Sequence, residues 1–281
     1  MNPDYERVYH YHVRKSAGSS LNAAFWALGG VDFATAEVRL RESPQSEFVG
    51  NGLRFVRNNP ALLARGDYFF ATTHRPAYHV ELPPRTFTIT ILRDPASRVL
   101  SYYHYMMWAR SSAEGGRDPF VDQVRSESDF MDRHPIRRIS LHTLRTDSAV
   151  RELGAGQLAR RMLPLRLRPE RRIADRSFAR FLARVSPRAL LAQLYMFSPR
   201  FDPAEAAERV LGCSAVCFTE TYAEDLKAVA AALELPLAEK RERRFTAKAA
   251  TPEADLELLR ERLAREYRMI ELVKQGLGRT A

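Results

Sequence analysis

Two short stretches of the sequence combine basic and hydroxyl side chains with the pattern of a strand-to-helix turn. The first is "RKSAGSS" at residues 14–20, between an aromatic and β-branched run at 7–13 and a helical pattern at 20–30. Such a turn presents unpaired backbone N–H groups and the positive end of a helix dipole. Anions, and phosphate above all, bind there. The stretch therefore predicts an anion site, with an ordinary serine-capped turn as the alternative.

Lys15 is the informative residue of this stretch. The chain has only five lysines among 44 basic residues, and Lys15 is the first of them. A Walker A loop ends in Lys after a glycine-rich run, whereas here Lys15 precedes the loop. In that place its charge would neutralise or protonate a leaving oxygen.

The second stretch is "RDPASRVLS", which follows the β-branched run "TFTITIL" at residues 86–92. Asp94 suits a helix N-cap and Pro95 the first helical position. Ser101 lies two helical turns beyond Asp94, so Arg93 and Ser101 can converge on one anion. The alternative is an Arg93–Asp94 pair beside a neutral Ser101. Two anion-binding strand exits predict a ligand with two separated phosphate-like groups.

The remaining pattern predicts strands that alternate with helices. We expect strands at 7–13, 68–74, 86–92 and 214–220, and helices at 20–30, 94–108, 177–185, 188–197, 202–211, 222–233 and 251–274. Residues 31–66 read as mixed and turn-rich. This order predicts an α/β fold with a central, mostly parallel sheet flanked by helices. Ligands of such sheets lie beyond the carboxyl ends of the strands, where both basic stretches fall.

Composition limits the class of protein. The apolar fraction of 45% and the charged fraction of 28% are typical of globular domains. No apolar run is long enough to span a membrane, and the N-terminus lacks a secretory pattern. We therefore expect a cytoplasmic chain without a membrane span, although it can also be a domain of a longer protein. The net charge of +10 favours anionic ligands. Cys213 and Cys217 are interpreted as packing residues in a reducing compartment.

Both stretches resemble motifs of the PAPS-dependent sulfotransferases, closest to the carbohydrate branch that includes the heparan sulfate 2-O-sulfotransferases. "HVRKSAGSSL" resembles the 5′-phosphosulfate loop His-x-Pro-Lys-Thr-Gly-[Ser/Gly]-[Thr/Ser]-Ser, with Arg14 in place of Pro and Ser16 in place of Thr. "ILRDPASRVLSYY" is similar to the 3′-phosphate motif Arg-Asp-Pro-x-x-Arg-x-x-Ser-x-Tyr at all of its specified positions. The resemblance covers roughly residues 7–109 and 177–275.

The resemblance implies a P-loop-like three-layer fold and a single sulfotransferase domain over residues 1–281, with a variable acceptor-side insertion at about 110–175. It implies PAPS (3′-phosphoadenosine 5′-phosphosulfate) as sulfuryl donor, PAP as product, and no metal. Lys15 would contact the sulfate and the bridging oxygen, and Arg93 and Ser101 would hold the 3′-phosphate. Arg244 and Lys248, in the basic stretch 240–250, would close over the nucleotide. The loop that wraps the 5′-phosphate would consist of Arg14, Lys15, Ser16, Ala17, Gly18, Ser19 and Ser20.

Sulfuryl transfer also needs a base for the acceptor hydroxyl. In the resembling family a Gly-His or His-Gly-His stretch precedes the 3′-phosphate strand, and His74 fits that place, with Thr73 where Gly is usual. We expect His74 to be the general base, with His79, His12 and Glu47 as weaker candidates. A structural His that caps a backbone group is the other interpretation.

The acceptor stays open at this stage. A hydroxyl-bearing small molecule, lipid or glycan fits a soluble bacterial enzyme, and the acceptor can be carrier-bound; the sequence does not give the oligomeric state. Two other functions compete. One is a P-loop-type kinase or other nucleotide-binding enzyme, which would need a Walker A loop. The other is a non-enzymatic polyanion-binding protein, suggested by the charge, although no nucleic-acid-binding module is evident.

Overall fold

The computed structural model describes residues 1–111, 178–240, 242 and 253–279. The chain divides into two compact units, one formed by Met1–Tyr102 with Val185–Ala281 and the other by Tyr103–Arg184. A single domain with an insertion at 110–175 stays a prediction, because nearly all of that stretch lies outside the described residues. The elements are, in order, β1 (Arg7–Tyr11), α1 (Gly18–Leu28), α2 (Phe33–Glu42), β2 (Glu47–Gly50), β3 (Leu53–Arg57), α3 (Pro60–Arg65), β4 (Phe70–Thr73), η1 (Ala77–His79), β5 (Thr86–Leu92), α4 (Pro95–Ser111), α9 (Phe178–Arg184), α10 (Pro187–Leu190), α11 (Ala192–Phe197), α12 (Pro203–Leu211), β6 (Ala215–Phe218), α13 (Tyr222–Leu233), α14 (Glu253–Arg262) and α15 (Ala264–Gly276).

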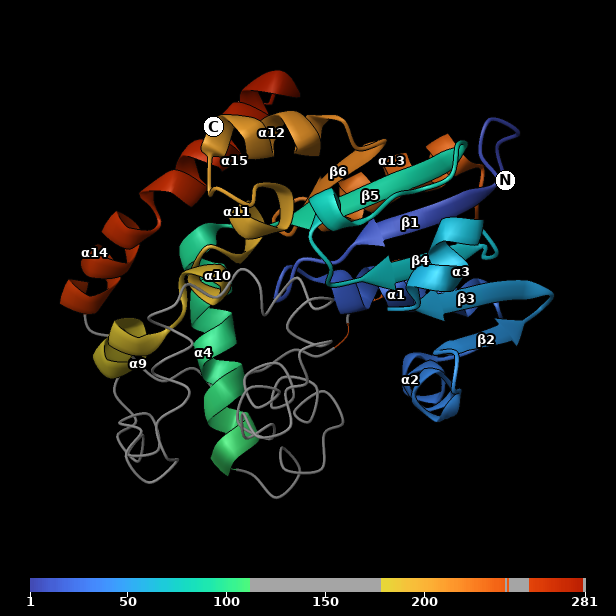
Figure 1. Ribbon diagram of the computed structural model, residues 1–281, viewed down its shortest axis with the longest axis horizontal. Helices are drawn as coiled ribbons and strands as arrows, with labels where there is room; N and C mark the ends of the chain where they lie inside the picture. The colour runs from blue at the N-terminus through green and yellow to red at the C-terminus, as the bar shows by residue number, and fades with distance from the viewer. Residues whose placement is uncertain (112–177, 241, 243–252, 280–281) are drawn as a thin grey trace, which may run out of the picture. The chain divides into compact units, whose positions relative to one another are not determined.

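The larger unit is built on a six-stranded sheet of order β2-β3-β4-β1-β5-β6 (Figure 1). Every neighbouring pair is parallel except β2 and β3, which form an antiparallel hairpin. The predicted α/β fold with a mostly parallel central sheet flanked by helices is therefore confirmed. The run at 86–92 forms β5 with the predicted bounds, between β1 and β6. Its mostly β-branched residues, of which the last four are buried, suit a strand covered on both faces.

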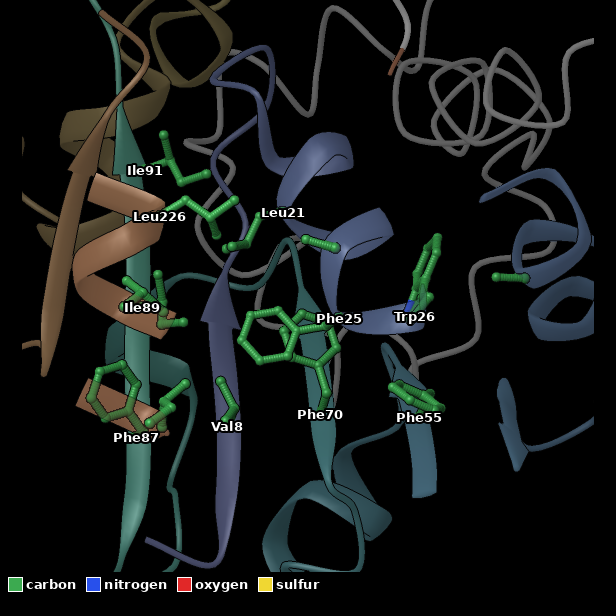
Figure 2. Close-up of a cluster of buried hydrophobic side chains, with 14 of the residues drawn as sticks. Val8, Leu21, Phe25, Trp26, Phe55, Phe70, Phe87, Ile89, Ile91 and Leu226 are labelled. Carbon is green, nitrogen blue, oxygen red and sulfur yellow. The ribbon is translucent and has the colours of Figure 1, made fainter. Parts of the chain in front are cut away.

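One face of the sheet packs against α1, α2 and α13. Val8 of β1 and Phe70 of β4 point to this face, where Phe25 of α1 stacks on Phe70 with ring centroids 4.3 Å apart (Figure 2). Leu226 of α13 reaches the same cluster beside Ile91 of β5. Apolar burial of this kind is the main stabilising contribution to such a layer.

The opposite face has its own cover. Tyr9, which follows Val8 and points the other way, packs with Leu62 and Leu63 of α3. At the β5–β6 side, α11, α12 and α15 bury a further cluster that includes Phe197, Val210 and Val273. Helices therefore cover both faces of the sheet. Successive residues of β1 point to opposite faces and so contact different helices.

Residues 31–66 contain more regular structure than the turn-rich interpretation allowed, which was wrong here. Polar and glycine residues that suggested turns in this stretch serve as helix caps and as a hairpin turn. Asp32 caps α2 by accepting from Thr35 N, and Asn59 caps α3 by accepting from Leu62 N. Between β2 and β3, Asn51 and Gly52 have φ of +46° and +75°, as a two-residue type I′ hairpin requires.

Two predicted helices are each divided in the structure. The helix expected at 251–274 is α14 followed by α15, with Leu263 between them, buried and outside helical geometry. The helix expected at 188–197 is α10 followed by α11, with Leu191 between them at φ −105° and ψ 46°. Neither break carries Pro or Gly. Local sequence therefore gives no signal for these bends, and the packing of the flanking apolar residues determines them.

Candidate anion-binding and proton-transfer site

The candidate residues follow three neighbouring strands at one edge of the sheet. The loop before α1 follows β1, His74 follows β4, and Arg93 follows β5. Since these strands are parallel and adjacent in the order β4-β1-β5, their carboxyl ends lie together. The chain leaves β1 toward β3 and β4 and later returns to its other side at β5. In doubly wound sheets such a reversal is where ligands bind.

The loop after β1 has the backbone form of an anion site. Lys15 and Ala17 have φ of +67° and +57°, on either side of Ser16. Positive φ is costly for non-glycine residues and is concentrated at functional sites. Alternation of the sign of φ turns successive N–H groups toward one concave side, which binds anions. Ala17 is the N-cap of α1 and makes no side-chain cap bond, so the serine-capped turn considered above is not what forms.

Ser16 adds a hydroxyl to this concavity. Its side chain is fully buried, and its Oγ has no hydrogen-bond partner among the described residues. Buried hydroxyls are nearly always hydrogen-bonded in folded proteins. The unsatisfied hydroxyl of this loop residue is therefore a candidate donor to a ligand of the loop.

Gly18 lets the start of α1 approach the sheet closely. A Cβ at this position would lie 2.1 Å from His12 Cδ2 and 2.9 Å from His10 Cε1. These imidazoles point to the α1 face because residues 8, 10 and 12 share one side of β1. The first turn of α1 thus rests directly on the two rings, without room for a side chain.

Gly18→Ala is expected to lower stability by about 1–3 kcal/mol, as overpacking of a well-packed interior does. Denaturant unfolding measures this loss. Gly212→Ala is the matched control, because a Cβ there meets its nearest atom, Arg209 O, at 3.5 Å and φ is not positive. Equal stability of the Gly18→Ala variant and the wild type would contradict the packing described.

His74 belongs to a stack of three imidazoles. The His10 and His12 rings are parallel within 18° with centroids 4.9 Å apart, and the His12 and His74 centroids are 4.4 Å apart. Parallel pairing of β1 with β4 sets His10 opposite Thr72, so His12 and His74 are the next pair on the same face. Alternation along "HYH" predicts only that His10 and His12 share one face of β1, whereas the approach of His74 depends on the register between β1 and β4.

The orientation of His74 suits a base. Its Nδ1 donates to the His12 carbonyl at 2.8 Å, which fixes the proton on Nδ1 and the lone pair on Nε2. His74 thus does cap a backbone group, as the structural alternative held, and the same bond sets the tautomer that a base requires. Burial lowers the pKa of His74 well below 6.5, and the charge of Arg14 adds to this; the bond to His12 opposes it. The ring is therefore neutral near pH 7.

The other candidate bases differ in placement. His79 is exposed in η1, and His12 is buried between the two other rings. Glu47 lies on edge strand β2, separated from β1 by β3 and β4, and its Oε2 lies 3.5 Å from Arg54 Nε. Burial lowers the pKa of His10 to about 4. His74 therefore stays the predicted base, with His79, His12 and Glu47 as the alternatives.

Arg93 joins the β5 exit to the β1 loop. Its Nη1 donates to the Lys15 carbonyl at 3.1 Å. No hydrogen bond or ion pair joins Arg93 to Asp94 among the described residues: Asp94 accepts from Ser97 N at 2.7 Å and from the Tyr267 hydroxyl at 3.1 Å, although its charge still acts to raise the pKa of Arg93. Partial burial lowers the pKa of Arg93, against the opposing effect of nearby carboxylates. This leaves its cation directed at the loop.

Ser101 is not brought into the same contacts. It is half-buried on α4, two turns beyond Asp94, and makes no hydrogen bond to Arg93 or the loop among the described residues. Arg98, three residues before Ser101 on α4, is buried in an ion pair with Glu266, with Nε and Oε1 3.2 Å apart. Whether Ser101 contacts an anion stays a prediction.

Within the basic stretch 240–250 the structure describes Lys240 and Glu242. The Glu242 N–H donates to Ser20 Oγ at 3.1 Å, which places Glu242 at the first turn of α1. Arg244 and Lys248 themselves lie outside the described residues, so their contact with a ligand stays a prediction.

No group of three or more His, Cys, Asp or Glu side chains placed to hold a metal ion occurs in the described ranges. In the same part of the chain, no helix combines the length and apolar character needed to cross a membrane. Comparisons with protein-family models, curated proteins and solved structures gave no match.

Proposed function

We propose that the chain is a P-loop-like sulfotransferase that moves a sulfuryl group from PAPS to an acceptor hydroxyl. The observation that carries the proposal is the hydrogen bond from Arg93 to the Lys15 carbonyl. This bond connects the exit of β5 with the loop after β1, so that basic residues from both strand ends contribute to one site. Such a site could bind two anionic groups. PAP has two phosphates, on the 5′ and 3′ positions of one ribose, so one nucleotide can engage both exits.

The residues present fit this nucleotide. The loop at 14–20 offers alternating backbone handedness, the uncapped start of α1 and the unsatisfied Ser16 hydroxyl to a 5′-phosphosulfate. Arg93 offers a planar guanidinium, the group best suited to a phosphate, to the 3′-phosphate. Ser101, Arg244 and Lys248 are proposed as additional contacts from the resemblance alone.

The chemistry assigned to the chain's own residues is direct in-line transfer. The acceptor oxygen would bond to the sulfur of bound PAPS as the bond from sulfur to the bridging oxygen breaks. The electron pair of the broken bond would stay with the bridging oxygen of the departing PAP. His74 Nε2 takes the proton of the acceptor hydroxyl. Lys15 and the N–H groups of the loop stabilise the negative charge that develops on the departing oxygen, a contribution that is commonly the largest in such sites.

A kinase or another nucleotide-binding enzyme is the second candidate, because the strand–loop–helix turn would also hold an ATP phosphate. The two functions differ at Arg93, since ATP has no 3′-phosphate. A thermal-shift comparison of PAP with Mg-ATP separates them. We expect PAP to raise the free energy of unfolding by about 2.7 kcal/mol at a hundred times its Kd, Mg-ATP to raise it less at the same concentration, and Arg93→Met to remove the difference.

Arg268→Met is the control for this comparison, because Arg268 is exposed on α15 and pairs only with Glu271 among the described residues. It should respond to both nucleotides as the wild type does. Stabilisation by Mg-ATP equal to or greater than that by PAP would favour the kinase and contradict the sulfotransferase.

A further inference from the structure

The side-chain amide of Gln193, on α11, brackets the backbone of Arg93. Its Oε1 accepts from the Arg93 N–H at 2.7 Å, and its Nε2 donates to the Arg93 carbonyl at 3.0 Å. The sheet bonding of β5 ends one residue earlier, where Thr219 N–H donates to the Leu92 carbonyl at 2.8 Å. Gln193 therefore extends the hydrogen bonding of β5 by one residue and holds both backbone groups of Arg93.

Gln193 is itself held by a buried ion pair. Its Nε2 donates to Glu266 Oε1 at 2.8 Å, and the same oxygen accepts from Arg98 Nε at 3.2 Å. Nε2 meets two acceptors and Oε1 meets a donor, so the amide has one satisfied orientation. The Arg98 and Glu266 side chains are 1% and 0% exposed. Separating them would leave an uncompensated buried charge, which makes this a rigid anchor.

The two bonds from Gln193 fix the direction in which the Arg93 side chain leaves the backbone. With its N–H and carbonyl both fixed, the backbone of Arg93 cannot turn, and the guanidinium leaves the sheet edge toward the Lys15 carbonyl. Fixing a side chain in its binding geometry before the ligand arrives increases affinity, because less freedom is lost on binding. The amide touches the backbone and not the guanidinium, so its effect on a ligand is indirect.

We propose that Gln193 is a positioning residue that orients Arg93 for the 3′-phosphate of the donor nucleotide. This inference rests on the proposed function. It gives α11 and α15, which lie in the C-terminal part of the chain, an indirect role in a site whose anion-binding loop and Arg93 come from the N-terminal part. A purely structural Gln193 would affect stability alone, whereas a positioning Gln193 also affects recognition of one phosphate.

Titration calorimetry of Gln193→Met with PAP and with 5′-AMP tests the proposal. Met has a similar length but neither accepts nor donates a backbone bond, and 5′-AMP lacks only the 3′-phosphate. We expect PAP affinity to fall about tenfold, the scale of one hydrogen bond to a charged group, while 5′-AMP affinity is unchanged. The control is Ser198→Ala, which removes a buried hydroxyl bonded to Glu205 at the end of α11 and should leave the PAP to 5′-AMP ratio unchanged.

A Gln193→Met protein that keeps the wild-type ratio of PAP to 5′-AMP affinity would overturn the inference. Circular dichroism and thermal melting establish that the variant is folded. If it is not, Gln193→Asn, which keeps the amide on a stem one methylene shorter, is titrated in the same way and judged by the same ratio. A wild-type protein that does not prefer PAP to 5′-AMP would instead overturn the proposed function, since no 3′-phosphate site would then exist.

Discussion

Lys15→Ala is expected to slow sulfuryl transfer by about 10²–10³-fold, the usual loss when one preorganised group that stabilises developing charge is removed. Lys15 lies in the strained loop between β1 and α1, with φ of +67° and with its carbonyl bonded to Arg93. Its ammonium group would balance the charge on the departing phosphate oxygen. Release of labelled PAP from PAPS under single-turnover conditions measures the effect on the chemical step.

Lys227→Ala is the matched control, because Lys227 is exposed on α13. It should retain wild-type turnover. A polyanion-binding protein would require neither lysine for specific chemistry, and its affinity for any polyanion would fall steeply with salt. Turnover that survives Lys15→Ala would therefore contradict the role given to this residue.

His74→Ala is expected to reduce kcat by about 10²–10⁴-fold, the contribution of a positioned general base. PAP affinity should stay at the wild-type value, because the assigned role of His74 is toward the acceptor and not the nucleotide. Turnover kinetics and PAP titration together separate the two effects. His79→Ala serves as control, since His79 is exposed in η1; loss of activity there, with His74→Ala active, would reverse the assignment of the base.

The pH dependence supplies a second readout of His74. Its pKa lies well below the ordinary value of 6.5 because burial and Arg14 both disfavour the charged ring. The base is active when neutral, so kcat/KM should stay level as pH falls through 6.5 and decline only at lower pH. An anionic nucleotide nearby would favour the charged ring, so the decline of kcat should lie at higher pH than that of kcat/KM. A kcat/KM decline above pH 6.5 would contradict the environment described.

Arg14 is the main departure from the motif that the loop resembles, where Pro is usual. In the structure its positive charge is one of the causes that lower the pKa of His74. A cation at this position therefore adds to burial, the larger cause, in lowering the pKa of the candidate base. That effect depends on the fold, because β1 and β4 must pair for residues 14 and 74 to come near each other.

The sequence was sufficient for the parts of the site that depend on local pattern. The β-branched run at 86–92 correctly predicts β5, and the Asp94-Pro95 pair correctly predicts the start of α4. Asp94 accepts from Ser97 N, as a helix cap does. The order of strands and helices gave the mostly parallel sheet. From that sheet it follows that the exits of β1, β4 and β5 lie at one edge.

The contacts that refine the site could not be predicted from local pattern. Gln193 reaches Arg93 across 100 residues, and no motif marks it. The bends at Leu191 and Leu263 arise from packing, without Pro or Gly. The stack of His10, His12 and His74 needs the register between β1 and β4, which the hydrophobic pattern of short strands does not determine.

A crystal structure of the chain with PAP would show directly whether one nucleotide engages both strand exits. We expect the 5′-phosphate on the backbone N–H groups of residues 15–20, with the Ser16 hydroxyl satisfied, and the 3′-phosphate on the Arg93 guanidinium. We also expect His74 Nε2 to face the side of the site from which an acceptor enters. PAP bound away from β1 and β5, or bound with its 3′-phosphate far from Arg93, would contradict the proposed sulfotransferase site.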